Sequence, residues 1–143
     1  MRKVLVAFDG SGHSKRALQY VIDFARDTGY PVEVHVLNVQ QEPVLYGDYM
    51  SPSMIDALKN SPLAKAEAVL EEAVTALQAA GLAHQTYPLL GNVAEQVHET
   101  VKRVGCDTVV MGTRGLGSFS GLLLGSVANR VIHEVSVPIV LVK

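Results

Sequence analysis

Short apolar runs rich in β-branched residues alternate along the chain with longer stretches of helical periodicity. The runs predict strands at residues 4–8, 32–39, 84–90, 107–111 and 137–142, and the stretches predict helices at residues 14–28, 61–80, 93–104 and 126–135. Strands that alternate with helices favour a parallel sheet, because the crossover between two parallel strands holds a helix. The sequence therefore predicts an α/β fold with an open, five-stranded parallel sheet and helices on both faces.

Three of the expected helices have a recognisable start signal, and that of the third is Asn92 with Glu95 three residues later, close to a capping box. Ser14 is expected to cap the first helix. Ser61 followed by Pro62 is expected to start the second helix, with serine as the cap and proline at the first helical position. Residues 40–60 before it have no long period, so we expect a mobile loop with a short helix at residues 54–58.

Composition bounds the class of protein. The chain has 143 residues, 48% of them hydrophobic, which is enough for a core, and a single domain over residues 1–143 is expected. The net charge is −2 and the Lys and Arg residues are scattered, which argues against a nucleic-acid partner. The apolar run at residues 4–8 is too short for a signal peptide, and no uncharged run is long enough to cross a membrane. Cys106 alone cannot form an intrachain disulfide, so a cytoplasmic location is expected.

A glycine-rich stretch from Gly112 to Ala128 stands between the fourth expected strand and a helix that begins near Ser126. Glycine has no Cβ, so the backbone of this stretch can bend sharply and approach a ligand closely. Its N–H groups and the positive end of the following helix both favour phosphate. The stretch therefore predicts a phosphate site; the alternative is that its glycines form only a flexible surface loop or a tight helix-packing site.

Two common phosphate motifs do not occur in the chain. No Gly-Lys dipeptide is present, which excludes GxxxxGK[ST], and Ser120 stands where the Rossmann pattern GxGxxG needs its third glycine. The spacing that remains is G-x2-G-x9-G-S, formed by Gly112, Gly115, Gly125 and Ser126. This spacing resembles the signature of the nucleotide-binding branch of the universal stress protein family, and the likeness extends over essentially the whole chain.

The resemblance implies a Rossmann-like sheet, of the type called adenine nucleotide alpha hydrolase-like, with strand order 3-2-1-4-5. In such a sheet ligands bind beyond the carboxyl ends of the strands where the strand order reverses, here between the first and fourth strands. Asp9 follows the first strand directly, so its carboxylate can accept hydrogen bonds from ribose hydroxyls or a base edge. The alternative is that Asp9 and Gly10 only form a turn.

The same resemblance places further residues around an adenine nucleotide. Asp9 would lie against the nucleoside, next to Ala7, which stands where many family members have proline. Val39 would hold adenine through its main-chain N–H and C=O groups. Arg114 would approach a phosphate or a partner subunit. The residues implied to pack near the nucleoside are Met111 and Gly112, and those implied to surround the phosphates are Gly115, Gly125, Ser126 and Val127.

These observations favour a nucleotide-binding regulatory or stress-response factor. Its expected ligand is ATP, with AMP or ADP as alternatives, and Mg²⁺ is expected to bridge the phosphates. No catalytic residue is assigned, because the chain lacks a phosphate-loop lysine and a clearly placed group to orient an attacking water. A slow ATPase on the same scaffold, or an interaction module without nucleotide, remain as alternatives.

The histidines have no metal-ligand spacing, so no protein metal site is expected. The apolar segment from Val137 to Val142 is expected to form a sheet edge, which exposes unpaired backbone groups. Pairing of this edge with its twin in a homodimer would cover it, as the resemblance also implies. The sequence does not identify a protein partner.

Overall fold

The computed structural model describes residues 1–44, 50–113 and 124–143. Five parallel strands form one sheet in the order β3-β2-β1-β4-β5, as the sequence and the resemblance predicted. The predicted fold class and strand order are therefore confirmed. The strands are β1 (Lys3–Ala7), β2 (Glu33–Gln40), β3 (His84–Leu90), β4 (Thr108–Gly112) and β5 (Ile139–Val142).

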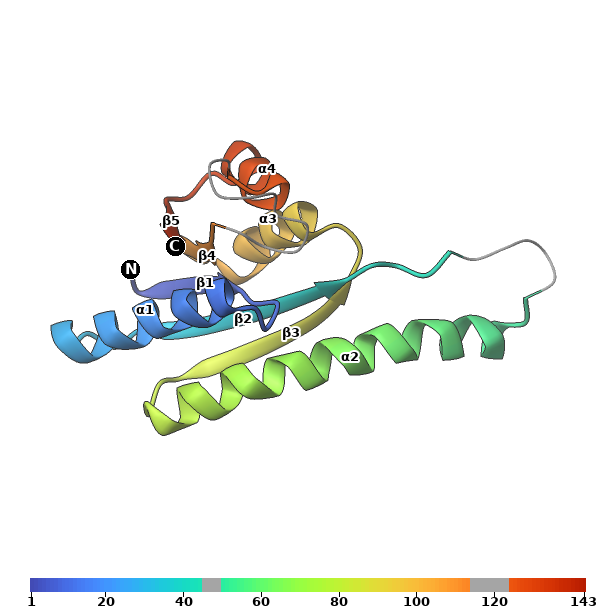
Figure 1. Ribbon diagram of the computed structural model, residues 1–143, viewed down its shortest axis with the longest axis horizontal. Coiled ribbons are helices and arrows are strands. Elements are labelled where there is room, and N and C mark those ends of the chain that lie inside the picture. Colours follow the sequence, from blue (N-terminus) through green and yellow to red (C-terminus); the bar gives the residue numbers. More distant parts are fainter. Residues whose placement is uncertain (45–49, 114–123) are drawn as a thin grey trace.

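Among the described residues, four helices connect these strands and cover both faces of the sheet. They are α1 (Gly12–Thr28), α2 (Pro52–Ala79), α3 (Val93–Val104) and α4 (Ser126–Glu134). Figure 1 shows α3 and α4 on one side of the sheet and α2 on the other. The buried side chains of α1 pack with those of α2, so these two helices share a face.

Successive residues of a strand point to opposite faces, and this alternation divides the core in two. Val4 and Val6 of β1 pack with α1 and α2, whereas Leu5 between them packs with α3 and α4. In β4, Val110 belongs to the first cluster and Val109 to the second. The central strands are thus buried on both faces, which explains why they are continuous apolar runs.

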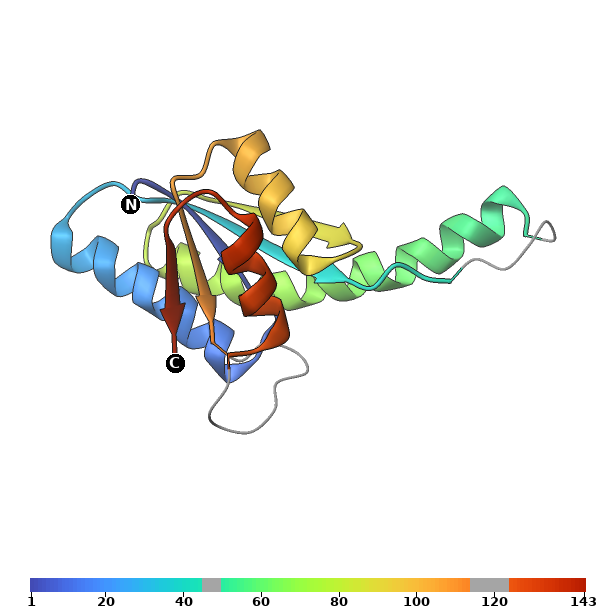
Figure 2. The same cartoon turned by 90° about the horizontal axis from the view of Figure 1, so that it is seen from above.

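The second helix begins earlier than the sequence analysis predicted. Ser51 caps it by accepting a hydrogen bond from Met54 N at 3.2 Å, and Pro52 occupies the first turn. The expectation that Ser61 and Pro62 start the helix is wrong, since Pro62 lies inside it. The same serine-proline signal occurs upstream, and Pro62 removes one N–H from a largely exposed part of the helix, where water can bind the carbonyl left over. Figure 2 shows this N-terminal half of α2 extending beyond the sheet.

The first helix also begins earlier than expected. Its cap is Ser11, whose side chain accepts a hydrogen bond from Ser14 N at 3.3 Å. Ser14 is buried in the first turn, and its hydroxyl donates to Ser11 O at 3.0 Å. The expectation that Ser14 caps the helix is therefore wrong, and the chain turns into α1 directly after Gly10, whose φ of 81° suits glycine.

Candidate functional site

The strand order reverses between β1 and β4, and a crevice opens there at the carboxyl end of the sheet. The chain leaves β1 toward α1 on one face and leaves β4 toward α4 on the other. An apolar pocket of about 60 Å³ lies between these exits. Its walls come from the ends of β1, β2 and β4, from the turn after β1, and from the starts of α1, α3 and α4. The lining residues are Ala7, Phe8, Asp9, Ser11, Ser14, Leu37, Asn38, Val39, Val93, Met111, Gly112 and Val127.

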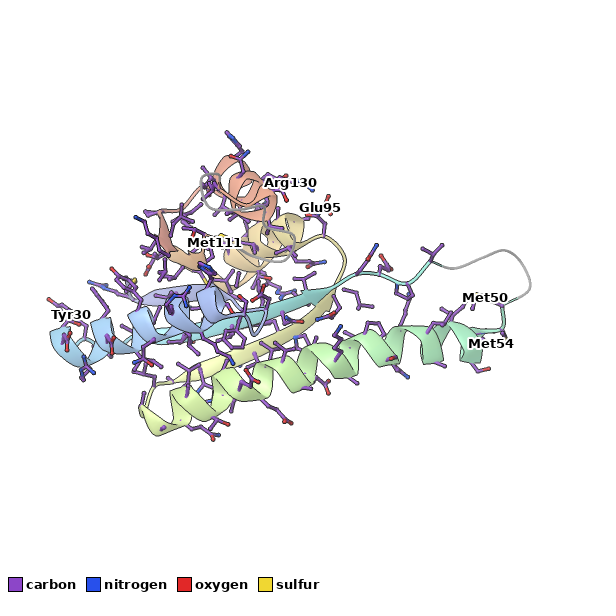
Figure 3. The ribbon with its side chains drawn as sticks, in the orientation of Figure 1. Tyr30, Met50, Met54, Glu95, Met111 and Arg130 are labelled. Carbon is purple, nitrogen blue, oxygen red and sulfur yellow. The ribbon has the colours of Figure 1, made fainter. Side chains whose placement is uncertain are left out.

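Most of the residues singled out in the sequence come together here. The six that line the pocket are Ala7, Asp9, Val39, Met111, Gly112 and Val127. Gly125 and Ser126 adjoin it at the start of α4. Arg114 and Gly115 lie outside the residues that the structure describes. Figure 3 shows Met111 close to the sheet and far from Met50 and Met54 at the distal end of α2.

Asp9 has a structural task in addition to its place in the pocket wall. Its Oδ1 atom accepts a hydrogen bond from Ser11 N at 2.9 Å. Together with the positive φ of Gly10, this bond forms the turn that leads from β1 into α1. The turn and the ligand-contact interpretations are therefore compatible, because a carboxylate has a second oxygen that can accept further bonds.

Gly112 allows β4 to approach α1 closely. A Cβ atom added at this position would lie 2.6 Å from His13 Cβ and 3.0 Å from the His13 main-chain carbon. Those distances are shorter than van der Waals contact, so any side chain would push the strand end and the helix start apart. The glycine thus sets the width of the crevice floor, in addition to any contact with a ligand.

The start of α4 differs from the starts of the other helices. Ser11, Ser51 and Asn92 cap α1, α2 and α3 with their side chains, whereas among the described residues no side chain caps α4. Its N-cap is Gly125, a buried residue with φ −58° and ψ 150°. Within the described part of the chain, the first N–H groups of α4 therefore have no side-chain partner, in the place where the helix dipole favours an anion.

Two main-chain bonds fix the ends of the glycine-rich stretch. Gly125 N donates to Thr113 O at 3.1 Å, and Thr113 N donates to Val142 O at 2.9 Å. The residue after β4 is thus bonded both to the start of α4 and to the end of β5. These bonds place the uncapped end of α4 directly beside the end of β4.

Asn38 is a pocket residue that the sequence analysis did not identify as a site residue. It is 3% exposed, its Nδ2 donates to Phe8 O at 2.8 Å, and its Oδ1 accepts from Gln40 Nε2 at 2.6 Å. These bonds tie the end of β2 to the chain just beyond β1. An amide side chain at the end of an otherwise apolar strand is the signal that could have revealed it, because a buried amide needs partners.

A wider, more polar hollow adjoins the apolar pocket. It has a volume of about 590 Å³ and shares Val39, Val93 and Val127 with the smaller pocket. The starts of α3 and α4 form two of its sides, and Arg130 lines it, with one guanidinium nitrogen 3.1 Å from Glu134 Oε1. A ligand seated in the apolar pocket therefore has room to extend beyond it.

The described residues carry neither a metal cluster nor a membrane-spanning helix, and the Cys106 thiol is buried. Within residues 1–44, 50–113 and 124–143, no three His, Cys, Asp or Glu side chains lie together as a metal site. Burial raises the pKa of Cys106 to about 11, so this thiol is protonated at neutral pH. No helix in this part of the chain combines the length and apolarity needed to span a bilayer.

The comparisons with known proteins place the chain in a family. The model of the universal stress protein family matches residues 1–143. The chain belongs to the universal stress protein family. A universal stress protein of Thermus aquaticus is 32% identical over 143 residues, which cover 99% of this chain and 98% of the relative.

Solved structures of universal stress proteins have the same fold. The protein MJ0577 superposes with a TM-score of 0.83 at 26% identity, covering 99% of this chain and 95% of that one. A universal stress protein family member of Arabidopsis thaliana, solved with AMP bound, gives a TM-score of 0.69 at 23% identity, covering 100% and 92% of the two chains.

Proposed function

We propose that this universal stress protein binds an adenine nucleotide, ATP in the first place, in the crevice between β1 and β4, and that it acts as a regulatory factor in a stress response. One observation carries the proposal: an apolar pocket at the switch point of the sheet lies beside a helix start that no described side chain caps. A nucleotide is a ligand with both an apolar ring and an anionic group, so it matches both features.

The base would occupy the apolar pocket, against the main chain of Val39. Pairing between β1 and β2 ends at Ala7 and Leu37, and Phe8 N donates to Leu37 O at 2.9 Å. Main-chain groups two residues apart on a strand point the same way. The N–H and C=O of Val39 are therefore directed toward the crevice, where β1 has already turned away, and they can bind the edge of adenine.

The ribose and phosphates would follow toward α1 and α4. Asp9 would accept a hydrogen bond from a ribose hydroxyl through the oxygen not bonded to Ser11 N. The N–H groups at the start of α4, with the Ser126 hydroxyl, would hold phosphate. Gly115 and Arg114 are proposed to add contacts from the glycine-rich stretch. Mg²⁺ would take most of its ligands from the phosphates and water.

The solved relatives support this assignment at the level of the fold. Besides the AMP-bound Arabidopsis protein, a universal stress protein was solved in complex with cAMP and an Archaeoglobus fulgidus member with dAMP. The fold of these relatives can thus hold an adenine nucleotide, and this supports the proposal that the pocket described above receives one.

Isothermal titration calorimetry with ATP and Mg²⁺ tests the proposal, using wild-type protein freed of nucleotide and the Asp9→Asn variant. Asparagine keeps an oxygen for Ser11 N but loses the second acceptor, so ATP affinity should fall about tenfold while the fold is preserved. Asp9→Ala also removes the acceptor for Ser11 N, and its affinity for ATP should be no higher than that of Asp9→Asn. Absence of ATP binding by the wild type would overturn the proposal, and steady phosphate release lost in Asp9→Ala would favour the slow ATPase.

We also propose a homodimer formed through the free edge of β5. Its residues are half-buried and pair with β4 on one side. A second copy running antiparallel would satisfy the backbone groups on the other side. Native mass spectrometry at micromolar concentration should show twice the chain mass, and a monomer would contradict the interface.

A further inference from the structure

His13 lies where the two sides of the crevice meet. It is in the first turn of α1, between the pocket residues Ser11 and Ser14. Its Cβ packs against Gly112 at the end of β4, at a distance that leaves no room for a side chain there. Thr113, the residue after Gly112, accepts a hydrogen bond from Gly125 N. His13 therefore lies beside the end of β4, which this bond joins to the start of α4.

Within the described part of the chain, one nitrogen of this histidine has no hydrogen-bond partner. Among the buried side-chain nitrogen and oxygen atoms in the described part of the chain, two have no hydrogen bond: His13 Nδ1 and Thr100 Oγ1. Other histidines are bonded; His35 Nδ1 lies 2.7 Å from Tyr87 Oη, and His84 Nδ1 lies 2.9 Å from Leu82 O. A buried polar atom without a partner costs free energy, so such an atom calls for a ligand, an ion or a water.

The two cations that follow His13 on α1 are engaged elsewhere. Lys15 Nζ lies 3.3 Å from Glu72 Oε2, and Arg16 Nε donates to Lys143 O at 2.8 Å. Both cationic head groups therefore already have a partner, whereas His13 Nδ1 has none among the described residues. Of these three side chains, His13 is the one left to meet a ligand held beside Gly112 and the start of α4.

We propose that His13 contacts a phosphate of the bound nucleotide, with Nδ1–H donating a hydrogen bond to a phosphate oxygen. This inference rests on the proposed function and adds a residue from the α1 side to a phosphate site otherwise built from β4 and α4. A neutral imidazole with its proton on Nδ1 can make this bond, and so can the protonated form. Phosphate is the favoured contact because the adjacent start of α4 presents N–H groups that no described side chain caps.

The test measures the affinities of the wild type and of His13 variants for ATP and for adenosine, which lacks the phosphates. The variants differ in which imidazole nitrogen their side chain can replace. Asparagine places its Nδ2 near the position of Nδ1, whereas glutamine places its amide near Nε2. We expect His13→Ala and His13→Gln to lose about tenfold in affinity for ATP, and His13→Asn to retain most of it. None of the three should change the affinity for adenosine. His133→Ala, on the exposed far end of α4, is the control and should match the wild type.

The outcomes separate this inference from the proposed function. If the wild type binds neither ATP nor adenosine, the nucleotide site itself is wrong. If it binds ATP and His13→Ala binds ATP equally well, the site stands and the role of His13 is refuted. Equal losses for ATP and adenosine would also refute it, because they would assign His13 to the nucleoside. Thermal unfolding of each variant shows that the losses do not come from a damaged fold.

Discussion

The two ends of the β1–β4 pair differ in how they are held together. At the amino end, Asp107 bridges the strands: its Oδ2 accepts from Arg2 N at 2.9 Å and from Lys3 N at 3.0 Å, and its own N–H donates to Lys3 O at 2.8 Å. At the carboxyl end the pairing stops at Val6 and Val110, before either strand ends. The same two strands are thus clamped at one end and open at the other.

This difference teaches where the molecule can be altered without loss of its fold. The side-chain bonds at the amino end stabilise the strand pair, and the crevice lies at its other end. The carboxyl end, where we propose that a ligand binds, is held instead by packing around Gly112 and by the bonds of Asn38. Changes at the amino end should therefore alter stability alone, whereas changes at the carboxyl end should alter binding, with or without stability.

Gly112→Val should have the largest effect and damage both properties. The new side chain would overlap His13 and force β4 and α1 apart, which should lower the free energy of unfolding by about 3 kcal/mol. Urea denaturation would show this as a lower midpoint, and calorimetry should show that ATP binding is lost. Ala80→Val adds the two Cγ methyl groups of valine at an exposed site and is the control. A wild-type midpoint for Gly112→Val would mean that the crevice floor is not tightly packed.

Asp107→Ala should weaken the fold at the closed end and leave binding intact. It removes the acceptor for Arg2 N, Lys3 N and the Thr108 hydroxyl, and since the side chain is 43% exposed we expect a loss of about 1–2 kcal/mol. The urea midpoint should fall, whereas the ATP dissociation constant should equal that of the wild type. A changed affinity would show that the two ends of the strand pair are coupled.

The contribution of Asp107 to the stability of the fold should also depend on pH. Burial by itself would raise the pKa of Asp107, but the hydrogen bonds from Lys3, Thr108 and Arg2 and the nearby N-terminal amine lower it overall. A carboxyl with a lowered pKa stabilises the fold above its unfolded-state pKa of about 4, and this contribution is lost as the pH falls through the folded-state value. The difference in unfolding free energy between wild type and Asp107→Ala should therefore shrink from pH 6 to pH 3.

The sequence predicted the framework and located most of the proposed site, but it missed what depends on proximity in space. Apolar runs and helical periods predicted five strands in a parallel sheet, because burial on both faces leaves a pattern in the chain. The predicted start of α2 was wrong because the sequence holds two serine-proline signals, and the exposed part of the helix tolerates Pro62 of the second signal within it. The roles of Asn38 and of Gly112 against His13 could not be predicted, since their partners lie on other elements.

Gly125→Ser should have the smallest effect on stability and still reduce binding. The backbone at Gly125, with φ −58° and ψ 150°, accepts any residue, so glycine is not required by conformation. Serine would give α4 the kind of cap that Ser11 gives α1, which should change the unfolding free energy by only a few tenths of a kcal/mol. Its hydroxyl would then accept a hydrogen bond from an N–H group proposed to hold phosphate, and ATP affinity should fall about tenfold by calorimetry.

Gly125→Ala adds the Cβ without the hydroxyl and so separates crowding of this buried position from capping. If Gly125→Ser binds ATP as tightly as the wild type does, the amides of α4 do not hold the phosphate, and the open end of the strand pair must bind its ligand in another way.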